Sequence, residues 1–183
     1  GGERSLYWRL SARDNLEYFA DLYKIPSKDQ KELIEKLIAQ VGLSEFIDKK
    51  VETFSKGMKQ RLQIARALLN NPKVIFLDEP SIGLDPVGAK ELRELIKKLS
   101  KEGVTILLTT HYMPEAEELC DRIAIIKKGK LLAIDDVVGL QSLVSNERKE
   151  EIKAKKEREQ EEKNKKNLEI TLEDIYIELL GDA

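Results

Sequence analysis

The sequence predicts an α/β fold in which an open, mostly parallel sheet alternates with helices. Two short apolar runs, VIFL at 74–77 and VTILL at 104–108, have the composition of parallel strands that are covered on both faces. Apolar residues recur at helical spacing over residues 57–70, before the first run, and over 92–99, between the two runs. This alternation of short buried strands with amphipathic helices is typical of open, mostly parallel α/β sheets.

The first fifty residues have the pattern of helices alone. Ser11 and Asp14 form a capping-box pattern at the start of one helix. Pro26 ends that helix, and we expect Ser27 and Gln30 to cap a second one. These residues therefore predict a helical subdomain that precedes the sheet.

A short helix near 114–119 and a hairpin are predicted after the second strand. The hairpin consists of RIAII, a KKGK turn and LLAI. Residues 145–167 include nine basic and seven acidic residues and almost nothing apolar, which predicts a solvated helix or a disordered linker. Thr171 and Asp174 then cap a predicted terminal helix.

These patterns divide the chain into three parts. Residues 1–52 are the predicted helical subdomain, 53–142 the sheet-containing core, and 143–183 a charged linker with its terminal helix.

Composition limits the possible functions of these 183 residues. The formal net charge is −2, so no strong positive field indicates a nucleic-acid partner or an anionic membrane surface. The single cysteine, Cys120, cannot form an internal disulfide and is expected to be a small buried apolar residue in a reducing compartment. No apolar run approaches the roughly 20 residues that span a bilayer.

Two stretches contain residues with candidate catalytic or binding roles. The first lies at the start of the first helix of the core, and the second lies at the end of the first strand. In TFSKGM, Ser55 and Gly57 open a helix whose N-terminus suits a phosphate; a plain N-cap and a turn glycine are the simpler interpretation. In VIFLDE, a buried strand ends in Asp78 and Glu79. Such a pair fits one carboxylate that holds Mg²⁺ and one that orients a water and takes its proton.

Two further features follow along the chain. In PSIGLDP, Gly83 permits a tight turn and Asp85 is placed to cap a helix that starts at Pro86. His111, the only histidine, directly follows the second strand. It is therefore expected at the carboxyl-end edge of the sheet, where open α/β folds bind ligands.

Together these stretches resemble the ABC ATPase family, over roughly residues 1–142 and most specifically over 53–111. FSKGM resembles the family's signature motif, commonly LSGGQ, followed by Walker B and the D-loop. TTHYMPEAEELCDRIAIIKKGKL resembles the H-switch region and the hairpin after it. SKGM and the ending LEITLEDIYIELLG are similar to the ATPases of ABC-2-type exporters. The implied fold is a partial P-loop NTPase-like ABC ATPase fold with a helical subdomain and a charged helical tail.

The resemblance implies a role for each matched residue. Asp78 would support Mg²⁺, Glu79 would be the catalytic base, and His111 would sense the γ-phosphate of ATP. Asp85 would be the D-loop acid. The signature residues would touch the ATP held by a second subunit; they are Ser55, Lys56, Gly57 and Met58.

The resemblance also implies partners and a location. Two such ATPase subunits, alike or different, would bind ATP between them and drive a membrane permease. The protein would then be cytoplasmic and peripheral on the inner face of the membrane, with no nucleic-acid partner.

A Walker A motif, G-x-x-x-x-G-K-[ST], does not occur in these 183 residues. The only Gly-Lys pair, Gly129-Lys130, is followed by Leu131, and the family's Q-loop glutamine position falls on Gly2. We therefore expect a truncated ATPase that does not hydrolyse ATP alone.

Two alternatives remain. One is a non-catalytic subunit without a P-loop that completes a partner's site. The other is a soluble ABC ATPase outside transport, although the long coiled coils or second cassette of such proteins do not occur here. ATP binding by the purified chain would distinguish the first alternative.

Overall fold

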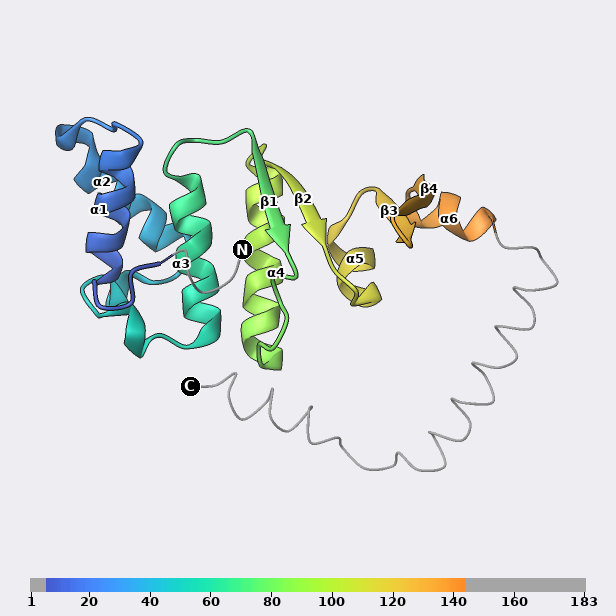
Figure 1. Ribbon diagram of the computed structural model, residues 1–183, viewed down its shortest axis with the longest axis horizontal. Coiled ribbons are helices and arrows are strands. Elements are labelled where there is room, and N and C mark those ends of the chain that lie inside the picture. The colour runs from blue at the N-terminus through green and yellow to red at the C-terminus, as the bar shows by residue number, and fades with distance from the viewer. Residues whose placement is uncertain (1–5, 144–183) are drawn as a thin grey trace, which may run out of the picture. The chain divides into compact units, whose positions relative to one another are not determined.

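The computed structural model describes residues 6–143 (Figure 1). The chain divides into two compact units, Gly1–His111 and Tyr112–Ala183, and each is considered by itself. The predicted charged linker and terminal helix lie outside the described residues, as does Gly2. The three-part division of the chain therefore stays a prediction. Within the described range, no helix has both the length and the apolar character needed to cross a membrane.

The first unit begins with two helices, α1 (Ala12–Leu22) and α2 (Ser27–Gln40). The capping box of α1 is confirmed: Ser11 Oγ accepts from the Asp14 amide at 3.0 Å, and the Ser11 amide donates to Asp14 Oδ2 at 3.2 Å. The predicted cap of α2 is wrong. Pro26 already holds the N-cap position, so Ser27 is the first helical residue.

Gln30 has a different role from the predicted cap. Its side chain is buried, and its Nε2 donates to Asp21 Oδ1 at 2.7 Å and to the Ile25 carbonyl at 2.8 Å. Gln30 thus ties the start of α2 to the end of α1.

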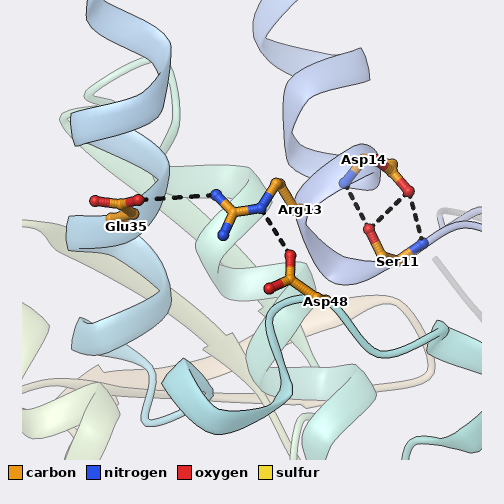
Figure 2. A network of polar contacts seen from close by, with 5 residues as sticks. All are labelled: Ser11, Arg13, Asp14, Glu35 and Asp48. Carbon is orange, nitrogen blue, oxygen red and sulfur yellow. Dashed lines mark hydrogen bonds and ion pairs between the residues drawn. The ribbon is translucent and has the colours of Figure 1, made fainter.

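Arg13 connects three segments of this helical region (Figure 2). From α1, its Nε donates to Asp48 Oδ1 at 2.8 Å, and its Nη1 lies 3.9 Å from Glu35 Oε1 on α2. The hydrogen bond to Asp48 is the main reason why the pKa of Arg13 is raised. A single β-bridge between Ser11 and Lys50 brings the same loop back to the start of α1.

Two short 3₁₀ turns, η2 (Ser44–Phe46) and η3 (Val51–Thr53), lead to α3 (Lys56–Leu68). The helices α1, α2 and α3 lie together in Figure 1 and share one apolar core. Its fully buried large side chains include Leu16, Ile34, Ile38, Leu43, Leu62 and Ile64.

The sheet of the first unit is a parallel pair joined by a helix. Strands β1 (Val74–Asp78) and β2 (Thr105–Thr109) are connected through α4 (Pro86–Lys101). They pair in register from Val74 opposite Thr105 to Asp78 opposite Thr109. Both predicted strands and their parallel pairing are confirmed, which places their carboxyl ends at one edge.

The expectation that both faces of this sheet are covered is wrong for the described residues. On β1, Ile75 and Leu77 are buried, but Phe76 is 75% exposed and Val74 46% exposed. Alternate residues of a strand point to opposite faces, so one face is packed and the other is open. Leu107 of β2 is 56% exposed.

The second unit contains a short helix, a hairpin and a final helical turn. They are α5 (Met113–Leu119), β3 (Ile123–Lys127), β4 (Lys130–Asp135) and α6 (Val137–Ser142). The predicted hairpin is confirmed as an antiparallel pair. Its two turn residues, Lys128 and Gly129, both have positive φ, which suits the twist of a two-residue turn.

Candidate functional site

The ends of β1 and β2 bring two polar side chains together. Asp78 and Thr109 are register partners, and the Thr109 hydroxyl donates a hydrogen bond to Asp78 Oδ1. One residue later, the Glu79 amide donates to the Thr109 carbonyl at 2.9 Å, which continues the strand pairing into the loop. The orientation of Asp78 is therefore fixed by the neighbouring strand.

Glu79 and His111 face each other across the same edge. His111 Nδ1 lies 2.8 Å from Glu79 Oε1, although the two residues are 32 positions apart in the sequence. The Glu79 side chain is 32% exposed and that of His111 73% exposed, so this pair is within reach of solvent. A carboxylate held in this way can bind and orient a water molecule.

The backbone of Glu79 is strained. Its φ of +46° lies in the left-handed region, which residues with a side chain seldom adopt. Such strain concentrates at functional sites, where the surrounding structure holds a side chain in a required direction. Here the hydrogen bond to Thr109 and the contact with His111 hold the residue on both sides.

The loop after Glu79 is a succession of tight turns that ends at α4. The Ile82 amide donates to the Glu79 carbonyl at 3.2 Å, and the Leu84 amide to the Ser81 carbonyl at 3.1 Å. Gly83 has φ +68°, as its predicted turn role requires. The predicted cap is confirmed, because Asp85 Oδ1 accepts from the Gly88 amide at 2.9 Å.

The signature-like stretch lies at the N-terminus of α3. Ser55 is its N-cap, and its Oγ accepts from the Met58 amide at 3.2 Å. Gly57 is not a turn residue, since it lies in the first helical turn and has no positive φ. The first turn of α3 contains no acidic residue that would oppose an anion at this end.

The structure thus forms two groups from the predicted site residues. Asp78, Glu79 and His111 meet at the edge of the sheet. The other group, from Ser55 to Met58, opens α3, and its Lys56 side chain ends near Gly83 in the loop that follows Glu79.

Thr109 is a site residue that sequence reasoning missed. Its position was the available signal. Thr109 ends the second strand, and in a parallel pair the last residue of one strand lies opposite the last residue of the other, here Asp78.

The carboxylates at this edge suit Mg²⁺ chemically. Magnesium prefers oxygen ligands and is commonly held by one or two carboxylates together with substrate phosphates. Within residues 6–143 no cluster of three or more metal-binding side chains occurs. Asp78, a single carboxylate oriented by Thr109, has the chemistry that such a metal–phosphate site uses.

Comparison with known proteins shows that the chain is similar to ABC transporter ATP-binding proteins. The ABC transporter family profile matches residues 3–82. The ABC transporter ATP-binding protein NatA of Bacillus subtilis is 40% identical over 152 residues, which cover 83% of this chain and 61% of NatA. A fluoroquinolones export ATP-binding protein of Mycobacterium tuberculosis is 42% identical over 142 residues, which cover 78% of this chain and 46% of that protein.

A solved structure resembles the fold. It is cbiO1 from Clostridium perfringens, part of the ABC transporter complex cbiONQ, with a TM-score of 0.70 and 28% identity. The match covers 76% of this chain and 56% of cbiO1. The chain therefore spans only about half the length of the proteins it matches.

Proposed function

We propose that this chain, which belongs to the ABC transporter ATP-binding family, contributes the hydrolytic and signature residues of an ATPase that drives export through a membrane permease. The observation that carries the proposal is the pair Glu79–His111 beside Asp78, at the carboxyl ends of two parallel strands. This edge is where open α/β sheets bind ligands.

Glu79 is the proposed general base. Its carboxylate would accept a hydrogen bond from a water, orient it toward the γ-phosphate of ATP and take its proton as the phosphate bond breaks. His111 would keep the carboxylate in place through Nδ1, so that the base does not turn away between turnovers.

Asp78 is the proposed Mg²⁺ ligand, held in direction by the Thr109 hydroxyl. The bound Mg²⁺ would neutralise negative charge on the phosphates. This role suits Asp78 because it is the last residue of β1 and lies next to the proposed base.

The signature group would act on a second subunit's nucleotide. Ser55 and Gly57 present a helix N-terminus with a hydroxyl beside it, a combination that suits a phosphate. Lys56 and Met58 flank Gly57, and Asp85 ends the loop that follows Glu79. ATP would then be sandwiched between two head-to-tail subunits, alike or different.

Export and a position at the inner membrane face are proposed from the relatives. One of them is named as a fluoroquinolone exporter's ATP-binding protein, and cbiO1 is part of a transporter complex. The permease would supply the membrane-spanning part.

Hydrolysis by the polypeptide of the complete gene tests this proposal. We expect Mg²⁺-dependent ATP hydrolysis that Glu79→Gln lowers by about 10²- to 10⁴-fold, the usual contribution of a general base. The variant should still bind ATP, since Gln keeps the size of the side chain. Hydrolysis unchanged by Glu79→Gln would refute the assignment.

A second candidate is a non-catalytic subunit that completes a partner's site. It is favoured by the N-terminus of α3, where Ser55 and Gly57 would serve a partner's nucleotide whether or not the chain binds ATP itself. Under this alternative, the complete gene product would neither bind nor hydrolyse ATP alone, but Ser55→Ala would lower hydrolysis by an ATPase partner.

A further inference from the structure

The Lys56 side chain lies across the loop that follows Glu79. A Cβ atom placed at Gly83 would lie 2.5 Å from Lys56 Nζ, 3.6 Å from its Cε and 3.8 Å from its Cδ. The end of the lysine therefore occupies the space that any side chain at residue 83 would need.

Leu84 lies near the same helical turn, since a Cβ atom placed at Gly57, which has none, would lie 3.9 Å from Cδ2 of Leu84. The first turn of α3 therefore meets the loop through Lys56 at Gly83, with Leu84 close by.

The loop transmits its position to Glu79. Its turns are closed by the hydrogen bonds from the Leu84 amide to the Ser81 carbonyl and from the Ile82 amide to the Glu79 carbonyl. Glu79 itself has a left-handed backbone that only its neighbours keep in place. A displacement of Gly83 would therefore change the position of the Glu79 side chain.

We propose that Lys56 is a positioning residue, which fixes the loop of residues 79–84 against the start of α3 and thereby couples the signature group to Glu79. Lys56 stands where the commonest signature, LSGGQ, has a glycine, which has no side chain to reach the loop. The catalytic meaning of this coupling rests on the proposed function, whereas the contact itself does not.

The consequence is a link between two nucleotide sites. Ser55 and Gly57 would touch the partner subunit's ATP, while Glu79 would act on ATP bound to its own subunit. Lys56 follows Ser55 directly, so a displacement of the signature turn by the partner's nucleotide would reach Glu79 through Gly83 and Ile82.

Magnetic resonance of this chain tests the coupling without any nucleotide. The chain has one histidine, so the imidazole signals belong to His111 and report on its surroundings, which include Glu79. Lys56→Ala should shift the Gly83 amide signal and also the His111 signal. Lys56→Met keeps a side chain that reaches as far as Cε, so it should return both signals most of the way to their wild-type positions.

Lys59→Ala is the matched control on the same helix. Lys59 Nζ lies 5.2 Å from the ring centroid of Trp8. Its removal should shift the signal of the single tryptophan and leave Gly83 and His111 unchanged.

The outcomes separate the inference from the proposed function. A Lys56→Ala variant that leaves the Gly83 signal unmoved would overturn the contact, and one that shifts Gly83 but leaves His111 unmoved would overturn the coupling. Loss of ATP hydrolysis in the complete protein would bear on the proposed function alone.

Discussion

Asp78 and Thr109 end two adjacent parallel strands as direct register partners, and the Thr109 hydroxyl donates to the Asp78 carboxylate. A carboxylate that already accepts one hydrogen bond can rotate less about its terminal bonds. Thr109 therefore fixes the direction in which the second carboxylate oxygen can meet a cation.

Replacing Thr109 by valine removes this hydroxyl at nearly constant shape. We expect Thr109→Val to raise the Mg²⁺ concentration that gives half-maximal ATP hydrolysis by the complete protein by about 10-fold or more, because residues that orient a metal ligand typically contribute 10- to 100-fold to metal affinity. A Mg²⁺ titration of the hydrolysis rate measures this. Thr105→Val, at the other end of β2, is the control and should leave the titration unchanged.

The Glu79–His111 contact predicts a graded response at residue 111. His111→Ala removes the group 2.8 Å from Glu79 Oε1 and should lower hydrolysis by the complete protein by about 10²-fold or more, the lower end of a general base's contribution. His111→Asn places an amide nitrogen near the position of Nδ1 and should restore part of the rate. Equal rates for the alanine and asparagine variants would show that this contact does not support Glu79.

The sequence predicted the helices, the strands and the places of most candidate site residues in the fold because each depends on local chemistry. Capping at Ser11 and Asp85, the apolar runs of β1 and β2 and the turn at Gly83 are all encoded within a few residues. The placement of Glu79 and His111 at one edge followed from the rule that parallel strands share their carboxyl ends.

Other features depend on contacts between distant segments and could not be predicted in this way. The hydroxyl of Thr109 matters only because of its register with Asp78, and Lys56 only because the loop passes beneath it. Serine is a favoured N-cap residue, but Ser27 lies one position after the N-cap, which is Pro26. The open face at Phe76 depends on which segments pack on the sheet, which its apolar composition does not specify.

The Arg13 network predicts a small, uneven effect on stability. The hydrogen bond to Asp48 is 2.8 Å long, whereas Glu35 is 3.9 Å away, and both carboxylates are largely exposed to solvent. Exposed ion pairs are worth about 0–1 kcal/mol, so Asp48→Asn should lower the free energy of unfolding by about 0.5 kcal/mol and Glu35→Gln by less. Urea denaturation of the two variants and of Arg13→Met measures this. A larger effect for Glu35→Gln would contradict the geometry.

Cys120 predicts slow, pH-shifted thiol chemistry. Burial raises the pKa of its thiol, and the carboxylates of Glu115 and Asp121 raise it further. We expect the alkylation rate of this single cysteine by iodoacetamide to rise with a midpoint above about 8.5, the ordinary value of a thiol. Because the unfolded thiol ionises first, the free energy of unfolding should fall as the pH rises from there toward the folded pKa.

Asp121→Asn provides the matched test for Cys120. It removes one nearby negative charge and should move the alkylation midpoint down, by less than Glu115→Gln does, since Glu115 contributes more. A midpoint at or below that of free cysteine in the native chain would contradict the assignment.

The most direct measurement of the central claim is single-turnover ATP hydrolysis by the complete gene product, comparing wild type with Glu79→Gln at saturating ATP and Mg²⁺. The account predicts that the variant binds ATP with unchanged affinity and that its cleavage step is slower by about 10²- to 10⁴-fold. A variant that cleaves ATP at the wild-type rate would contradict the assignment of Glu79 as the base.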